Sequence, residues 1–156
     1  MSQPTMDTDR INMVMDLLGG ARTFQHVPVD ALEIHDAIRS GFPGDALTEL
    51  VANVPVVADP AMLDMAVGIS VRTLQRRKSE VNKSRLSLEQ SARAWKFAEI
   101  VARATSVLGS QSDAEKWLET PAIGLDQQRP IDLLTTPVGT ELVEQFLERL
   151  EYGVYV

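Results

Sequence analysis

The feature that most constrains the fold is a helical pattern between Ser87 and Gly109. In "SLEQSARAWKFAEIVARATSVLG", apolar residues recur every three or four positions, as they do on the buried side of an amphipathic helix. Ser87 is a preferred N-cap and Gly109 a preferred terminator, so both ends are marked. This is the longest and most clearly marked helix that the sequence predicts.

Shorter segments with helical spacing account for most of the remaining chain. Asp30 is a possible cap, Ser112 and Glu115 form an S-x-x-E capping box, and Thr136 with Pro137 begins the last helix. The predicted helices lie in "TDRINMVMDLLGG", "DALEIHDAIRSG", "GDALTELVANV", "DAEKWLET", "RPIDLL" and "TTPVGTELVEQFLERL". The fold class is therefore predicted to be all-α.

Residues 60–79, "PAMLDMAVGISVRTLQRRKS", have the order of a helix-turn-helix. Gly68 allows the left-handed turn and Ser70 caps the second helix. Asp64 stands where the motif usually has alanine, and Arg77 where it usually has an apolar residue. The apolar positions that pack the two helices together are Leu63, Val67, Ile69 and Leu74. We expect them in a core separate from a C-terminal one that contains Trp117, Leu118, Leu133, Leu134 and Phe146.

Charge is segregated along the chain. The net charge is -7, yet Arg72 to Arg103 holds nine basic and three acidic residues, a balance of +6 that leaves -13 elsewhere. Such segregation suggests different partners for different regions. A solvated basic helix surface would give the same local balance, so charge alone leaves both interpretations open.

Several side chains in the basic region have the chemistry that DNA contacts need. Arginine can bond guanine edges and glutamine adenine edges, whereas other cations suit phosphates. The predicted DNA-binding residues are Ser70, Arg72, Gln75, Arg76, Arg77, Lys83 and Arg85. Helix-turn-helix geometry also occurs as pure structure, which remains the alternative.

The sequence offers little catalytic chemistry. It has no cysteine, and its two histidines, His26 and His35, accompany no nucleophile or metal motif. We therefore predict no catalytic residue, no metal site, no cofactor and no enzyme activity. No apolar run approaches the roughly 20 residues of a membrane span, and absent cysteine fits a reducing compartment. A cytoplasmic protein without membrane contact is expected.

The segment Glu148 to Val156, "ERLEYGVYV", places two tyrosines, a glycine and two valines after an acidic helix. Chain termini are usually polar unless something holds them, so this apolar segment implies a receiving surface. That surface belongs either to a partner or to the chain's own last helix.

Several of these motifs together resemble a known family. "LLGG", "VPVDALEIHDAIRSGFPGDAL", "GISVRTLQRRK", "LSLEQSARAWKFAEIVARA", "AEKWLETPAIGL" and "RPIDLLTTPVGTELVEQFLERLEYGVYV" occur in the order of the Xre/MbcA/ParS antitoxins, partners of RES-domain toxins. The resemblance covers roughly residues 17–156. The most specific part is W-L-x-x-P, then P-x-x-L-L-x-T-x-x-G and Y-G-V. Ala122 departs from a frequent asparagine, and Gln127-Gln128 from frequent glycines.

The resemblance implies an antitoxin of two parts. Residues 1–109 would form an Xre-like DNA-binding domain that includes the helix-turn-helix at 60–79, and residues 110–156 a small helical toxin-binding domain. RES toxins resemble ADP-ribosyltransferases and deplete NAD, and the antitoxin's C-terminal end blocks their NAD site. The predicted toxin-binding residues are Leu150, Glu151, Tyr152, Gly153, Val154, Tyr155 and Val156.

The expected partners are a RES-domain toxin encoded by an adjacent gene and the operator DNA of the chain's own operon, which it would repress. A homodimer, or a hetero-oligomer with the toxin, is expected because a helix-turn-helix reads two-fold sites. Two alternatives remain: a stand-alone helix-turn-helix regulator, which leaves the apolar segment unexplained, and an adaptor that binds no DNA, which leaves the basic segment unexplained.

Overall fold

The computed structural model describes residues 8–80 and 84–153, and these residues form helices and short connections. The α-helices are α1 (Thr8–Leu17), α2 (Ala31–Ser40), α3 (Asp45–Asn53), α4 (Pro60–Val67), α5 (Val71–Ser79), α6 (Leu88–Leu108), α7 (Gln111–Leu118), α8 (Pro130–Leu133) and α9 (Pro137–Glu151). Single 3-10 turns are η1 (Gly20–Arg22), η2 (Pro55–Ala58) and η3 (Ile123–Leu125). Extended pairing among the described residues is limited to the isolated bridge between Ala122 and Gln128. The all-α prediction is confirmed.

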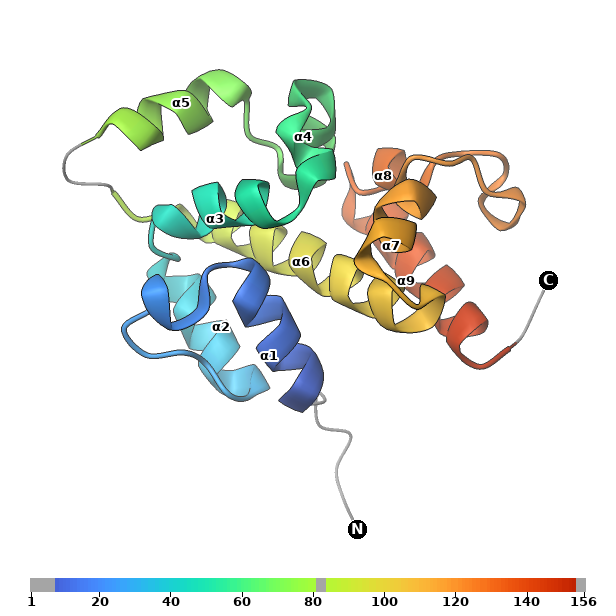
Figure 1. The fold of residues 1–156 in the computed structure, drawn as a ribbon, viewed down its shortest axis with the longest axis horizontal. Coiled ribbons are helices and arrows are strands. Elements are labelled where there is room, and N and C mark those ends of the chain that lie inside the picture. The colour runs from blue at the N-terminus through green and yellow to red at the C-terminus, as the bar shows by residue number, and fades with distance from the viewer. Residues whose placement is uncertain (1–7, 81–83, 154–156) are drawn as a thin grey trace, which may run out of the picture.

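Helix α6 is the central element, and the other helices pack around it (Figure 1). It contacts α1, α2, α3 and α4 as well as α7 and α9. Phe97, Ile100 and Val101 on α6 are almost completely buried. As predicted, Ser87 caps its start and Gly109 ends it with φ 101°; Gln90 completes a capping box with Ser87 that was not predicted. The pattern that marked this helix in the sequence therefore also marks the axis of the core.

The buried apolar side chains form one continuous core, so the prediction of two separate cores is wrong. Leu63 and Leu74 of the helix-turn-helix belong to the same cluster as Leu118 and Leu134 near the C-terminal end. The physical reason is that α6 has buried residues along its whole length and faces both groups of helices. Phe146 is only half-buried and does not belong to the buried cluster.

The start of α7 differs from the predicted capping box. Ser110, not Ser112, is the N-cap, and its side chain accepts a hydrogen bond from the Asp113 amide at 3.1 Å. Glu115 is engaged elsewhere, because its Oε1 accepts a hydrogen bond from the Val56 amide at 2.7 Å. The Glu115 carboxylate, which the local sequence pattern assigned to the cap, therefore makes a long-range contact with Val56.

The loop between α7 and α8 contains two unusual backbone conformations. Asp126 and Gln127 have φ values of 55° and 64°, in the left-handed region that favours glycine. Gln127 is one of the positions at which the resembling family often has glycine, and the positive φ explains that preference. Gly124 in the same loop lies directly against the ring of Phe146, where a Cβ atom would clash.

Candidate DNA and partner interfaces

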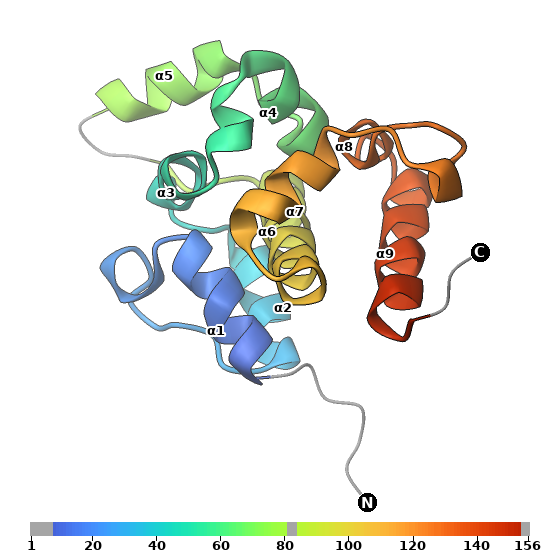
Figure 2. The same cartoon turned by 45° about the vertical axis from the view of Figure 1, so that its right-hand side comes forward.

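Helices α4 and α5 form the helix-turn-helix that the sequence predicts. Asp59 caps α4 by accepting hydrogen bonds from the Ala61 and Met62 amides. Gly68 ends α4 in the left-handed conformation with φ 69°, and Ser70 caps α5 by accepting from the Thr73 amide. Local hydrogen bonds thus mark where α4 ends and α5 begins. Helix α5 lies at an edge of the molecule, away from α9 (Figures 1 and 2).

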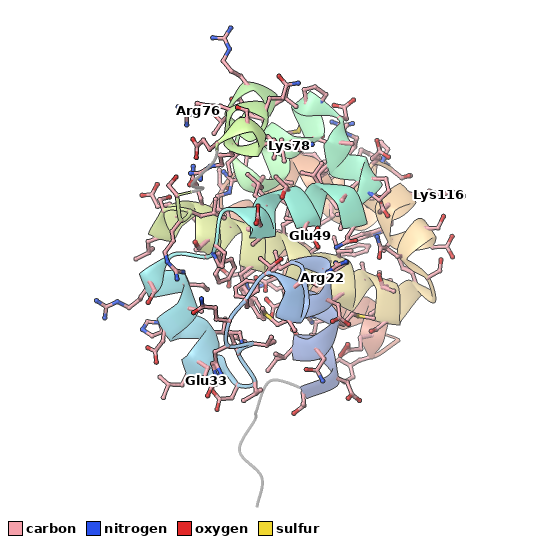
Figure 3. The ribbon with its side chains drawn as sticks, turned by 60° about the vertical axis from the view of Figure 1, so that its left-hand side comes forward. Arg22, Glu33, Glu49, Arg76, Lys78 and Lys116 are labelled. Atoms are coloured by element: carbon pink, nitrogen blue, oxygen red, sulfur yellow. The ribbon has the colours of Figure 1, made fainter. Side chains whose placement is uncertain are left out.

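The outward side of α5 carries most of the predicted DNA-contacting side chains. Arg72, Gln75 and Arg76 are all exposed. Figure 3 shows Arg76 and Lys78 on this helix. The Ser70 hydroxyl is exposed as well, but it is held by its capping bond and by the Thr73 hydroxyl 3.0 Å away. The arrangement leaves a cationic helix face free to approach a polyanion.

Arg77 does not lie on that face, which corrects its assignment to phosphate contacts. Its side chain is buried, and its Nη1 donates to the backbone oxygen and the hydroxyl of Ser84 at 3.1 and 3.2 Å. Its Nη2 donates more weakly to Gln90 Oε1, at 3.4 Å. Arg77 stands where the motif usually has an apolar residue, so its stem enters the core while its head bonds the segment after α5. That motif position was the signal in the sequence for an inward direction.

The two remaining basic candidates follow α5. Arg85 is exposed, and its Nη1 donates to the Gly41 carbonyl at 2.8 Å, which ties this segment to the end of α2. Lys83 lies outside the described residues. Arg85 also borders an open cleft of about 540 Å³ whose wall includes Phe24 and Phe42. The rings of Phe24 and Phe42 pack edge to face in this wall of the cleft.

Helix α9 has a buried side and an exposed apolar side. Val143 and Leu147 are fully buried, whereas Val138 and Leu142, one turn apart, are 71% and 45% exposed. Phe146, one further turn along, stacks on Trp117 with 6.1 Å between the ring centroids. A row of apolar residues at i, i+4 and i+8 therefore runs along α9.

The predicted toxin-binding segment begins where this row ends. Tyr152 is 71% exposed, and Gly153 has φ 69°, in the left-handed region that favours glycine. Leu150 is half-buried, and Glu151 pairs with Arg10 of α1 at 3.6 Å. Val154, Tyr155 and Val156 lie outside the described residues. The part that is described presents one tyrosine to the surface and turns the backbone at the glycine.

Helix α9 is also tied to α6 by charge. Lys96 Nζ of α6 donates to Glu99 at 2.8 Å and to Glu144 of α9 at 2.9 Å. Burial opposes the charged form of Lys96, but the two carboxylates outweigh it and raise the pKa of Lys96 above its ordinary value. The region from residue 110 to 156 contains nine acidic and three basic residues, so its surface is predominantly acidic.

Metal and membrane chemistry find no support in the part of the chain that the structure describes. No group of three or more histidine, cysteine, aspartate or glutamate side chains in residues 8–80 and 84–153 is arranged to hold a metal ion. His26 instead lies 3.1 Å from Glu33. None of the helices formed by those residues is long and apolar enough to cross a membrane.

A cationic helix-turn-helix and an acidic helical region, both packed against α6, define a protein that joins a DNA-binding motif to a second interaction region. Comparison with known families gives the same division. Residues 33–99 match the antitoxin Xre-like helix-turn-helix domain, and residues 103–153 match the antitoxin Xre/MbcA/ParS C-terminal toxin-binding domain. The chain belongs to the Xre family of antitoxins, as its resemblance predicts.

Curated relatives agree with this assignment. The chain is 32% identical to antitoxin Xre of Yersinia enterocolitica over 77% of its own length and 79% of that protein. It is 33% identical to antitoxin Xre of Pseudomonas putida over 78% of its length and 72% of the relative. The two family matches meet inside α6, so the predicted boundary between residues 109 and 110 stays a prediction.

Proposed function

We propose that this antitoxin neutralises a RES-domain toxin encoded beside it by inserting residues 150–156 into the toxin's NAD site, and that it represses its own operon through α5. The observation that carries the toxin part is the exposed Tyr152 at the end of the apolar row on α9. Both activities consist of binding, with no catalytic step by the antitoxin itself.

The C-terminal surface supports binding to a protein. Aromatic side chains at interface centres supply large contact area at low entropic cost, and Tyr152 has a hydroxyl that can orient it. Val138 and Leu142 extend the apolar contact beyond the inserted segment. The acidic balance of this region suits a toxin cleft that is basic because it holds the phosphates of a dinucleotide.

The helix-turn-helix surface supports binding to operator DNA. Arg72, Gln75 and Arg76 project from α5 with the chemistry that reads base edges. Because two-fold operators are read by two-fold proteins, the bound form is a homodimer or a hetero-oligomer assembled by the toxin. Arg77 is excluded from this proposal because its guanidinium is bound internally.

The toxin part is tested by NAD consumption. Purified RES toxin is assayed with the full chain and with a chain lacking Tyr152 to Val156, beside a circular dichroism melt of each antitoxin. We expect the shortened chain to fold and to leave the toxin active. Full inhibition by the folded, shortened chain would refute the insertion.

Point variants separate aromatic anchoring from general exposure. Tyr152→Ala should weaken toxin binding by about 2 kcal/mol or more, as truncated anchors at interface centres do. Leu32→Ala is a matched control, since Leu32 of α2 is 69% exposed and lies outside the proposed interface. Equal losses in the two variants would show that Tyr152 has no special role.

Gel-shift titration at two salt concentrations tests the DNA part. Arg72→Ala and Arg76→Ala should each cost about 1 to 3 kcal/mol at the operator and relax its specificity, whereas Lys83→Ala should mainly flatten the salt dependence. The exposed Arg39 of α2 supplies the control, Arg39→Ala. Operator binding without any effect on a purified adjacent toxin would favour the stand-alone regulator.

A further inference from the structure

One side chain, Arg93, bonds both the helix-turn-helix and the C-terminal region. It projects from the second turn of α6 and is half-buried. Its Nη2 donates to the Met65 carbonyl at 2.7 Å and to the Leu134 carbonyl at 3.2 Å. Met65 lies in the last turn of α4, and Leu134 directly follows α8. A single guanidinium therefore joins the ends of two helices that are far apart in the sequence.

Both acceptors are groups that need an external donor. The last carbonyls of a helix have no partner within the helix, and the planar guanidinium can serve two of them at once. Arg93 also lies against the turn itself, because a Cβ atom on Gly68 would clash with its Nη1. The geometry thus presses a charged, planar group against the turn that sets the angle between α4 and α5.

Burial and a nearby carboxylate act on the charge of this group in opposite directions, and burial has the larger effect. Burial lowers the pKa of Arg93 from its ordinary value, and the carboxylate of Asp64 on α4 opposes that shift. Asp64 stands at the motif position that usually holds alanine. The Asp64 carboxylate, four residues before Gly68, therefore interacts electrostatically with the Arg93 guanidinium.

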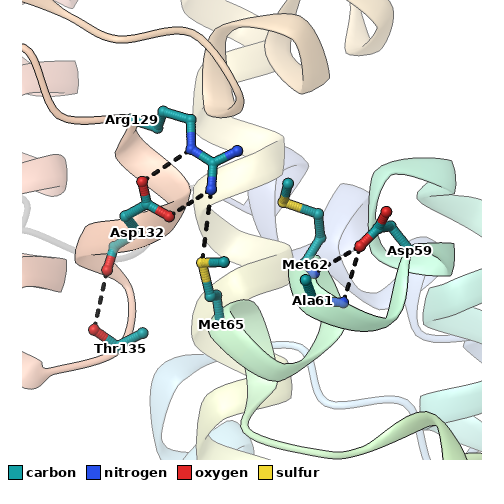
Figure 4. A network of polar contacts seen from close by, with 7 residues as sticks. All are labelled: Asp59, Ala61, Met62, Met65, Arg129, Asp132 and Thr135. Atoms are coloured by element: carbon teal, nitrogen blue, oxygen red, sulfur yellow. Dashed lines mark hydrogen bonds and ion pairs between the residues drawn. The ribbon is translucent and has the colours of Figure 1, made fainter.

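The residue before Leu134 packs closely against the start of α9. Gly139 of α9 approaches the Leu133 backbone so closely that a Cβ atom would clash with it, and Thr136 caps the helix. Helix α8 is tied to α4 by a second arginine: Arg129 binds Asp132 at 2.7 Å and lies 3.9 Å from the Met65 sulfur (Figure 4). A shift of α9 relative to α6 must therefore move the carbonyl that Arg93 holds.

We propose that Arg93 is a positioning residue that links toxin binding on α9 to operator binding by α5. The inference rests on the proposed function, since it requires both partners. Toxin contact along α9 displaces the Leu134 carbonyl, which changes the hold of Arg93 on Met65 and Gly68 and so the orientation of α5. Linkage is reciprocal, so operator DNA changes toxin affinity by the same factor as toxin changes operator affinity.

The test is a linkage measurement on the full chain. Operator affinity is measured with a DNA fragment of the chain's own promoter, with and without saturating purified toxin, for the unmodified chain, Arg93→Met and Arg103→Met. Arg103 is the matched control: it is half-buried on the same helix and makes no described hydrogen bond to α4 or α8. Methionine keeps most of the apolar stem and removes the donors.

Toxin should change the operator affinity of the unmodified chain and of Arg103→Met by about fivefold or more, the lower end of typical coupling factors. In Arg93→Met, the ratio of operator affinities with and without toxin should lie within about twofold of one. Inhibition of toxin NAD consumption by Arg93→Met should stay within about threefold of normal, because Arg93 is not part of the toxin-contacting surface. Amide exchange in residues 71–79 should change on toxin binding only where Arg93 is present.

Two results would overturn the inference while leaving the proposed function intact. One is a ratio near one in the unmodified chain, which would mean that the two sites are independent. The other is an unchanged ratio in Arg93→Met, which would mean that coupling bypasses this residue. If the unmodified chain fails to inhibit the toxin or to bind the operator at all, the proposed function itself fails, and that outcome is distinct from both.

Discussion

Helices α5 and α9 carry the two proposed contacts, and they are attached to the core in different ways. α5 buries only Leu74 and Arg77; it also contacts α3 and α4 and is bonded to the segment that follows it. α9 buries Gly139, Val143 and Leu147 along its length and adds an ion pair to α6. The two helices also differ in the side chains that they expose, which are cationic on α5 and apolar on α9.

This difference follows from the partners that the two surfaces suit. Binding to phosphates requires exposed positive charge, so a DNA-reading helix can leave most of its surface outside the core. Binding to a protein partner buries apolar area. A helix that exposes apolar side chains for this purpose needs its opposite side firmly packed in the core. Four predictions test this contrast, beginning with the largest expected effect.

Leu147→Ala should destabilise the whole molecule. Leu147 is fully buried on α9 in the core that also contains Leu74, so its truncation should cost about 2 to 5 kcal/mol in the free energy of unfolding. Urea denaturation followed by both circular dichroism and tryptophan fluorescence should show one transition at a lower midpoint. Two separated transitions would mean that α9 and the helix-turn-helix unfold independently.

Arg77→Met should weaken α5 through folding. It removes hydrogen bonds from a buried guanidinium to Ser84, which should cost about 1 to 3 kcal/mol in the free energy of unfolding. The exposed neighbour Arg76 provides the control, and Arg76→Met should leave the unfolding midpoint nearly unchanged. A normal midpoint together with a flatter salt dependence of operator binding would return Arg77 to the DNA-contacting set.

Phe146→Ala should have a smaller effect than truncation of a fully buried aromatic. Phe146 is half-buried and stacked on Trp117, so we expect a loss of about 1 to 2 kcal/mol in the free energy of unfolding. Leu142→Ala, one turn earlier on the exposed row, should change it by less than about 0.5 kcal/mol. Urea midpoints measure both, and a loss of 3 kcal/mol or more for Phe146→Ala would show a buried ring.

Asp132→Asn should have the smallest effect. The hydrogen bond from Arg129 holds the pKa of Asp132 below its ordinary value, so the ionised carboxylate is stabilised in the folded state. This contribution is present above the ordinary pKa and is lost as the pH falls through the lowered folded value. Because the pair is partly exposed, the difference from the unmodified chain should be about 0.5 kcal/mol or less at neutral pH.

The control for Asp132→Asn is Asp126→Asn, at an exposed position in the loop that precedes α8. Thermal melts across the acidic range should bring Asp132→Asn and the unmodified chain together at low pH. A difference that persists or grows on acidification would show that the Arg129–Asp132 pair is not its source.

The local parts of the fold were predictable because they depend on a few neighbouring residues. The caps at Asp30, Ser70, Ser87 and Thr136 and the left-handed turn at Gly68 are all present. Features that depend on distant contacts were not predictable. Glu115 was assigned to a cap but binds Val56, and two cores were expected where α6 joins one.

The candidate sites show the same limit. The exposed cations of α5 follow from helical spacing alone. The motif position of Arg77 indicated its inward direction, but its partners Ser84 and Gln90 were not predictable, because the sequence pattern does not place them beside it. Arg93 was counted only as part of the basic segment, since nothing local indicates that it meets both Met65 and Leu134.

A crossed assay tests the central claim, that one core presents a DNA-reading helix and a separate toxin-binding end, most directly. The double variant Arg72→Ala/Arg76→Ala and the chain lacking Tyr152 to Val156 are each measured for operator binding and for inhibition of toxin NAD consumption. We predict that the double variant loses operator binding and still inhibits the toxin, and that the shortened chain does the reverse. Loss of both activities in either folded variant would contradict two separate surfaces.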